Sequence, residues 1–263
     1  MNKKRKKDSH KGENGIVLII GGSERYSGAP YLATRAVAAL RTGPDLVFLA
    51  CPHQVAWAIN SMNPDLITEK LRGKYLKKRH FRKLVKMSEK ADVILLGPGI
   101  GQHKKTKKLL EKFLPVVKDK KKVVDADALK TVKIQELENT VFTPHQKEWH
   151  VLLENSGLSE KNYRSKLKSN VLLLKGKQDK IISKDKKKTN KTGNEGMTVG
   201  GTGDILAGLT AGFIAQGMSL FKAAERAAKL NGKLGDKLKE ELGYGMIASD
   251  FLKEIAVVNK KMK

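Results

Sequence analysis

Short apolar runs alternate with amphipathic stretches along most of the chain. Apolar runs of about four to eight residues between turn-forming residues are typical of strands that are buried on both faces of a sheet. These runs predict strands over residues 16–20, 46–50, 93–96, 123–125, 140–142, 171–174 and 180–183.

Apolar positions that recur every three or four residues predict helices between these strands and after the last one. The alternation of strands and helices is typical of an α/β fold in which helices cover both faces of a mostly parallel sheet. The lysine-rich segment 184–191 predicts an exposed hairpin tip or loop. The helices are expected over residues 30–41, 76–90, 104–117, 146–155, 204–216, 220–230, 232–241 and 247–258.

Length and composition fit one α/β domain. The chain has 263 residues, of which 40% are hydrophobic, and this is enough apolar material for one sizeable core. We expect a basic disordered tail over residues 1–8 and a single domain over residues 9–263, with no further domain before it. Cys51 is the only cysteine, which excludes an intramolecular disulfide, and its place in an apolar run predicts a buried side chain rather than a nucleophile.

The charge pattern narrows the class of partner. No apolar run approaches the ~20 residues that cross a bilayer, and no signal peptide is evident, so we expect a cytoplasmic protein that does not bind membranes. The formal net charge of +26 favours anionic ligands. Because the lysines are scattered and aromatic residues make up only 5% of the chain, no specific nucleic-acid binding is expected.

The most informative segment is Gly200-Gly201-Thr202-Gly203-Asp204, which precedes an apolar helix. A glycine-rich turn that enters a helix leaves backbone N–H groups unpaired and directed at one point, where the helix dipole adds positive potential. The residues from Gly200 to Gly203 are therefore predicted to form an anion hole, in which Asp204 can serve as the general base for a hydroxyl group. The simpler alternative is that Thr202 or Asp204 only caps the helix.

Further candidate residues follow predicted strands, at the sheet edge where open α/β sheets bind ligands. Glycine turns let the backbone approach a ligand, carboxylates attract a cation or cap a helix, and a lysine can bind phosphate. Each feature taken alone is more often structural, and no further ligand cluster supports a zinc site. The candidates are Gly97-Pro98-Gly99, Asp125 with Asp127, His145 with Glu148, and Lys175-Gly176.

Taken together, these motifs resemble the NAD(P)H-hydrate dehydratases of the ribokinase-like superfamily. The run that ends at Asp204 resembles the Gly-x-Gly-Asp signature of ribokinase-like kinases, in which the aspartate is the catalytic base. The resemblance extends from about Ser9 to Gly217. Its other motifs are Ser9-His10-Lys11-Gly12-Glu13-Asn14-Gly15, Gly21-Gly22-Ser23, Tyr26-Ser27-Gly28-Ala29-Pro30, Leu96-Gly97-Pro98-Gly99, Asp125-Ala126-Asp127-Ala128-Leu129, Thr143-Pro144-His145-Gln146-Lys147-Glu148 and Leu174-Lys175-Gly176-Lys177-Gln178-Asp179.

Two positions depart from the pattern of this family. Ser27 stands where proline is frequent in relatives. Gln146-Lys147-Glu148-Trp149 stands where relatives commonly have Pro-Gly-Glu-Phe, so the loop around it is expected to differ in shape.

The resemblance implies a ribokinase-like three-layer sandwich and a metabolite-repair enzyme, a carbon–oxygen lyase. The enzyme would restore NADH or NADPH from the hydrated S-form, with ADP or ATP as phosphoryl donor and Mg²⁺ as cofactor, and it would be a homo-oligomer. Asp204 would be catalytic, and Glu148 would lie near the Mg²⁺-bound phosphates. Contacts to the hydrated nucleotide are implied for Ala29, Gly99, His145 and Asp204, and contacts to the adenine nucleotide for Lys175, Gly176, Lys177, Gln178, Asp179 and Gly203.

Three alternatives remain at this point. A small-molecule kinase of the same superfamily, acting on a vitamin-precursor alcohol, would release a stable phosphoester. A basic nucleic-acid-binding module without catalysis would show binding that falls steeply with salt. A catalytically silent nucleotide sensor is the third, and no feature of the sequence favours it.

Overall fold

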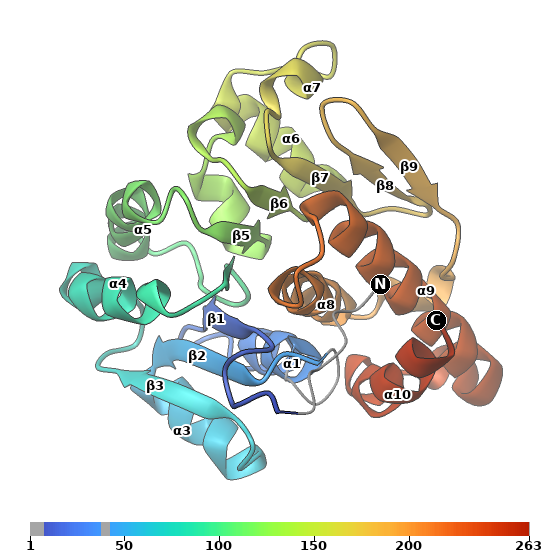
Figure 1. Cartoon of the computed structure of the whole chain (residues 1–263), viewed down its shortest axis with the longest axis horizontal. Helices are drawn as coiled ribbons and strands as arrows, with labels where there is room; N and C mark the ends of the chain where they lie inside the picture. Colours follow the sequence, from blue (N-terminus) through green and yellow to red (C-terminus); the bar gives the residue numbers. More distant parts are fainter. Residues whose placement is uncertain (1–7, 38–42, 263) are drawn as a thin grey trace.

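The structure is a computed structural model that describes residues 8–37 and 43–262. Its described strands form one nine-stranded sheet in the order β3-β2-β1-β4-β5-β6-β7-β8-β9 (Figure 1). Strands β1 to β7 pair in parallel, and β8 and β9 add an antiparallel hairpin at one edge. The bounds are β1 Ile16–Ile20, β2 Leu46–Pro52, β3 Ile67–Leu71, β4 Val93–Leu96, β5 Lys121–Val124, β6 Thr140–Phe142, β7 Val171–Leu174, β8 Asp179–Ile182 and β9 Lys187–Asn190.

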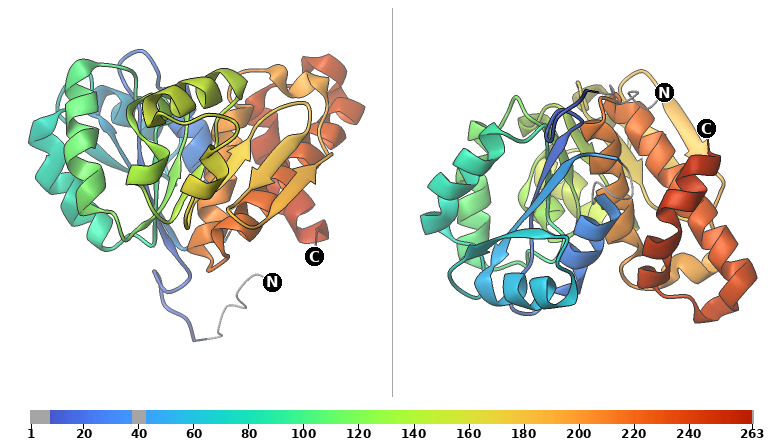
Figure 2. Two further views of the ribbon diagram at one scale, coloured as in Figure 1. Left: turned by 90° about the horizontal axis from the view of Figure 1, so that it is seen from above. Right: turned by 60° about the horizontal axis from the view of Figure 1, so that its bottom comes forward.

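Helices cover both faces of the sheet, and this confirms the predicted α/β architecture (Figure 2). Each face has its own apolar core, and a strand contributes alternate residues to the two cores. In β1, Val17 and Ile19 belong to one core, whereas Leu18 and Ile20 belong to the other. One face is covered by α1 (Gly28–Val37), α3 (His53–Met62), α8 (Thr202–Ala215), α9 (Leu220–Leu242) and α10 (Ala248–Lys261), and the other by α4 (Phe81–Glu89), α5 (Lys104–Val116) and α6 (Gln146–Ser156).

Shorter elements complete the chain. One short α-helix, α7, spans Tyr163–Lys166. The 3-10 helices are η1 Lys78–His80, η2 Ala126–Thr131, η3 Ile134–Glu136, η4 Glu195–Thr198 and η5 Gly243–Gly245.

Several predicted elements differ from the observed ones. Strand β3 and helix α3 were not predicted, because β3 has three polar residues between two apolar ones at the sheet edge and α3 has a short, mixed sequence. The segment 184–191 contains strand β9 as well as the hairpin tip. The predicted helix 30–41 extends past the described part of α1, and the predicted tail 1–8 lies outside the described residues except for Asp8.

A single helix, α9, replaces the two helices predicted around Gly232. A Cβ atom at Gly232 would lie 2.2 Å from Oγ1 of Thr192, so this glycine allows a close packing contact and does not break the helix. Cys51 lies in β2 and is fully buried, as predicted, and burial raises the pKa of its thiol to about 12. In the described part of the chain, every helix is too short or too polar to cross a membrane.

Helix α8 is the central helix of its layer. All of its residues from Ile205 to Ile214 are buried, between the sheet on one side and α1 and α9 on the other. Gly208 makes this possible, because a Cβ atom there would lie 2.5 Å from the carbonyl oxygen of Ala33 in α1. The helix begins at the carboxyl edge of the sheet, beside Lys175, and ends at the amino edge, where Ala215 contacts Gly15.

Candidate active site

Three neighbouring parallel strands bring a polar cluster together at their carboxyl ends. Asp125 follows β5, Thr143 follows β6 and Lys175 follows β7. Lys175 Nζ lies 2.9 Å from Oδ1 of Asp125, and the Thr143 hydroxyl donates a hydrogen bond of 2.7 Å to the same oxygen. Asp125 is therefore a central member of the site, although the sequence left its role open between cation binding and helix capping.

Glu148 joins this cluster from the first turn of α6. Its backbone N–H donates to Nδ1 of His145, and its Oε2 accepts a hydrogen bond from the His145 backbone N–H. This reciprocal capping box fixes the Glu148 carboxylate, whose Oε2 lies 3.8 Å from Lys175 Nζ. The His145 side chain is half exposed at the start of α6. Because Nδ1 accepts a hydrogen bond, the ring proton of neutral His145 is on Nε2, which lies 3.6 Å from Oε1 of Glu148.

The glycine-rich turn enters α8 at the same edge. Gly201 is the N-cap residue with a φ of 100°, and it has no side chain with which to cap the helix. The Thr202 hydroxyl donates to the carbonyl oxygens of Met197 and Val199, so the capping role considered for Thr202 is wrong. In the part of the chain that the structure describes, the Asp204 carboxylate forms no hydrogen bond either. The first amides of α8 are thus free to bind an anion.

Asp204 lies in the first turn of α8, close to the charged cluster. A Cβ atom at the adjacent Gly203 would lie 3.3 Å from Lys175 Nζ, which shows how near the two elements are. Burial raises the pKa of Asp204 to about 7, the Asp125 and Glu148 carboxylates raise it too, and the Lys175 ammonium opposes them. A carboxyl group with a pKa near neutrality is suited to general-base catalysis.

Lys175 carries the positive charge of this cluster. Burial lowers the pKa of Lys175, but the Asp125, Glu148 and Asp204 carboxylates outweigh burial and hold the pKa above its ordinary value. The ammonium group is therefore protonated at neutral pH, opposite the Asp125 and Glu148 carboxylates and the Asp204 carboxyl group. The described residues contain no preformed group of three metal ligands. Carboxyl groups nevertheless outnumber the single ammonium group beside the predicted phosphate site. This fits Mg²⁺, which is commonly held by one or two carboxylates together with substrate phosphates.

The Gly97-Pro98-Gly99 turn lies next to this cluster. At Gly97 a Cβ atom would lie 1.9 Å from the carbonyl oxygen of Asp125, so only glycine permits this approach. Gly99 has a φ of 64°, and a Cβ atom there would lie 2.9 Å from Cδ of Pro30. Ala29 is in the first turn of α1, and Leu32, three residues on, contacts Gly201. The structure therefore brings the turn and Ala29 to the same edge as Asp204.

Residues 175–179 form the turn between β7 and β8. The Gly176 backbone N–H donates to Oδ1 of Asp179, and Asn190 Nδ2 donates to Oδ2. The Asp179 carboxylate thus stabilises the hairpin from inside, whereas Lys177 and Gln178 are exposed. Only Lys175 of this segment enters the charged cluster.

A cavity of about 390 Å³ opens beside the Gly97–Gly99 turn, and no sequence pattern predicted it. Ser23 lines the cavity and links it to the turn, because its hydroxyl donates a hydrogen bond of 2.8 Å to the Gly99 carbonyl oxygen. Part of the lining follows β3, which was not predicted. The lining residues are Ser23, Glu24, Arg25, Tyr26, Lys74, Tyr75, Ile100, Gly101, Gln102, His103, Asp127 and Lys130.

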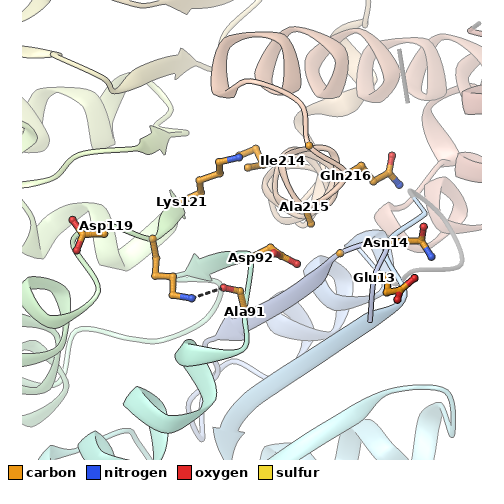
Figure 3. A pocket seen from close by; sticks show the side chains of 12 residues that line it. Glu13, Asn14, Ala91, Asp92, Asp119, Lys121, Ile214, Ala215 and Gln216 are labelled. Carbon is orange, nitrogen blue, oxygen red and sulfur yellow. Dashed lines mark hydrogen bonds between the residues drawn. The ribbon is translucent and has the colours of Figure 1, made fainter. Parts of the chain in front are cut away.

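A second cavity of similar size lies at the opposite, amino edge of the sheet (Figure 3). It is lined by residues that precede β1, β4 and β5, among them Glu13, Asp92 and Asp119, and by the end of α8 with the two residues after it, from Ile214 to Gly217. None of the predicted catalytic or binding residues lines it. The predicted chemistry is therefore confined to the carboxyl edge.

Comparisons with known proteins identify similar sequences and structures. The profile of a family described as NAD(P)H-hydrate dehydratase matches residues 17–257. The bifunctional NAD(P)H-hydrate repair enzyme Nnr of Methanothermobacter thermautotrophicus is 40% identical over 268 residues, which cover 97% of this chain and 51% of that protein. The chain thus spans about half the length of the bifunctional relatives that it matches.

Two further proteins match over nearly their whole length. The ADP-dependent (S)-NAD(P)H-hydrate dehydratase of Nitrosopumilus maritimus is 36% identical over 97% of this chain and 92% of that protein. The ADP/ATP-dependent NAD(P)H-hydrate dehydratase of Bacillus subtilis, co-crystallized with ATP and Mg²⁺, has a TM-score of 0.82 at 25% identity, over 99% of this chain and 94% of that chain.

Proposed function

Because the chain belongs to the NAD(P)H-hydrate dehydratase family, we propose that it restores NADH or NADPH from the hydrated S-form in a reaction that consumes ADP or ATP. The observation that carries this proposal is the position of Asp204. It is a partly buried carboxyl group with a pKa of about 7, at the start of a helix whose first amides have no side-chain cap. A base beside an anion hole is what phosphoryl transfer to a hydroxyl group requires.

The first step is phosphorylation of the hydrated ring. Asp204 removes the proton of the C6 hydroxyl, whose oxygen then attacks the terminal phosphorus of the donor nucleotide. The bond from that phosphorus to the bridging oxygen breaks, and the shortened nucleotide leaves. The amides from Gly201 to Gly203, together with Lys175, stabilise the negative charge on the transferring phosphoryl group.

The second step restores the reduced ring. Phosphate is a better leaving group than hydroxide, so the C6–O bond breaks with its electron pair going to the phosphate. The lone pair of the ring nitrogen assists this departure, and loss of a C5 proton forms the C5–C6 double bond. Ala29, Gly99 and the Nε2–H group of His145 are the contacts that orient the ring toward Asp204.

The adenine nucleotide lies on the β7–β8 side of the site in this proposal. Lys175 binds its terminal phosphate, and the turn from Gly176 to Asp179 contacts its other groups. Mg²⁺ would be held by these phosphates and by Glu148, and it would neutralise phosphate charge. The Asp125 and Glu148 carboxylates outnumber the single ammonium of Lys175 even when Asp204 is protonated, which supports the presence of a cation here.

The proposal is tested by mixing the protein with hydrated NADH, Mg²⁺ and either ADP or ATP. We expect the absorbance of reduced nicotinamide to return only with nucleotide, with one phosphate released for each NADH restored, and the better donor is identified at the same time. Asp204→Asn should bind nucleotide but restore no NADH. A stable phosphoester with no recovery of NADH would instead indicate a small-molecule kinase.

A further inference from the structure

The cavity beside the Gly97–Gly99 turn is not used by any step described so far. It lies where β1, β3, β4 and β5 end, on the side of Asp125 away from β7 and β8. The turn from Lys175 to Asp179 lies on the other side, so the two flanks of the site are separate. Tyr26 bounds the cavity and also contacts Gly99: a Cβ atom at Gly99 would lie 2.9 Å from the Tyr26 carbonyl oxygen.

The proposed substrate is much longer than the ring that reacts. If the hydrated ring is held between Gly99 and Asp204, a ribose, a diphosphate and an adenosine must extend from it. The β7–β8 flank is taken by the donor nucleotide in the proposed function. The remaining length of the substrate therefore has to leave toward the cavity.

The charges of the cavity suit a diphosphate. Lys74 Nζ lies 2.9 Å from Oε1 of Glu24, and Lys130 Nζ lies 2.8 Å from Oδ1 of Asp127. Arg25 is a further cationic side chain of the lining. Within the described chain it has no carboxylate partner, and its guanidinium lies 5.3 Å from the centre of the Tyr26 ring. One unpaired positive charge is thus left in the lining, on the side chain best able to bind phosphate through two hydrogen bonds.

Phosphate can also recruit Lys74. Both members of the Lys74–Glu24 pair are more than half exposed. Exposed ion pairs contribute little stability, so Lys74 can exchange its Glu24 partner for a phosphate oxygen at small cost. The Asp127 carboxylate of the other ion pair has a second partner, because it accepts hydrogen bonds from both Lys130 and Gln102.

An aromatic platform lies at the same cavity. The rings of Tyr75 and His103 stack with their centres 3.6 Å apart and their planes within 15°. The His103 ring is fixed, because its Nδ1 accepts a hydrogen bond from the Lys105 backbone N–H at the start of α5. A flat, fixed pair of rings is suited to stack against a purine base.

We propose that this cavity binds the adenosine-diphosphate half of the hydrated dinucleotide, with Arg25 on the diphosphate and the Tyr75–His103 stack against the adenine. This assignment rests on the proposed function, since it places the same substrate. It makes Arg25 and Tyr75 binding residues that act on the dinucleotide but not on the reacting ring.

The test compares two probes that differ only in this half, intact NADH and reduced nicotinamide mononucleotide. Their dissociation constants are measured by fluorescence titration, with Mg²⁺ and a non-hydrolysable ATP analogue filling the donor site. Arg25→Glu should weaken NADH binding about tenfold, the equivalent of one lost charge-assisted contact, and should change mononucleotide binding less than about twofold. Tyr75→Leu, which keeps an apolar side chain but loses the stack, should show the same selectivity with a smaller effect.

Lys184→Glu is the matched control, since it makes the same change of charge at an exposed position on the β8–β9 hairpin. It should leave both dissociation constants unchanged. Equal weakening of both probes by Arg25→Glu, no weakening of either, or an equal effect of Lys184→Glu would overturn the assignment. Failure of the proposed function is seen separately, as absence of NADH recovery from an enzyme that still distinguishes the two probes.

Discussion

Lys175 Nζ lies 2.9 Å from Oδ1 of Asp125, in an ion pair whose carboxylate side is only 3% exposed. The two residues are fifty positions apart and meet because β5, β6 and β7 are consecutive parallel strands. In this pair the ammonium group is held within reach of Glu148 and close to Gly203. The pair therefore couples the stability of the sheet edge to the electrostatics of the site.

Removing the cation should destabilise the protein. Lys175→Met leaves the buried Asp125 carboxylate without its counter-charge, and we expect the free energy of unfolding to fall by about 3 kcal/mol, as for other broken buried pairs. Urea denaturation at pH 7 measures this change. The double variant Lys175→Met/Asp125→Asn should regain part of the loss, because no uncompensated charge then remains. Equal stability of wild type and Lys175→Met would contradict the buried ion pair.

The rate of NADH recovery should depend on the protonation of Asp204. The pKa of this carboxyl group is raised to about 7, and only its deprotonated form can accept the hydroxyl proton. We therefore expect kcat/KM to be low near pH 5 and to rise with pH through about 7. Lys175→Met should shift this rise to higher pH, since Lys175 lowers the pKa of Asp204. A flat profile between pH 5 and 8 would exclude Asp204 as the base.

The same carboxyl group should reduce stability at neutral pH. The pKa of Asp204 is raised on folding from its ordinary 3.8 to about 7, so the folded state binds the proton more tightly than the unfolded state. Stability should then fall as pH rises from about 4 to 7. Asp204→Asn removes this loss and should raise stability at pH 8 by roughly 1–4 kcal/mol, as about three pKa units at 1.36 kcal/mol each would allow. Thermal denaturation at pH 4 and pH 8 should show the gain only at the higher pH.

Gly99 and Gly157 form a matched pair for testing the glycine turn. Their φ angles are 64° and 60°, but a Cβ atom would lie 2.9 Å from Pro30 Cδ at Gly99 and would have no neighbour within 4 Å at Gly157. Alanine should therefore cost about 1 kcal/mol at Gly157, from backbone strain alone, and about 1–3 kcal/mol more at Gly99, from overpacking. Only the Gly99→Ala variant should also lose activity. Equal costs at both positions would mean that the turn relaxes freely around a methyl group.

The sequence predicted the sheet best where strands are buried on both faces. The predicted strands 16–20, 93–96, 140–142 and 171–174 have the observed bounds, because uninterrupted apolar runs can only be central strands here. Strand β3, with the sequence Ile-Thr-Glu-Lys-Leu, lies at the edge and buries little, so its pattern was not distinctive.

The candidate site was predicted unevenly for a similar reason. Asp204 and the glycine-rich turn belong to one continuous segment, and local rules for helix starts are enough to identify them. The Asp125–Lys175 pair depends on strand order, which no local pattern specifies. Arg25, Tyr75 and His103 come from three separate loops, and one of these follows the strand that was not predicted. Their meeting place could be found only in the folded chain.

The burial of α8 has a consequence for how the protein loses function on heating. Active sites formed by surface loops often melt before the rest of a protein, because such loops open locally with little free energy. Here the base lies in the first turn, and the anion hole at the N-terminus, of a helix whose residues from Ile205 to Ile214 are buried between the sheet and two other helices. The amides of α8 should exchange hydrogen among the slowest in the protein, and the site should fail only when the whole domain unfolds.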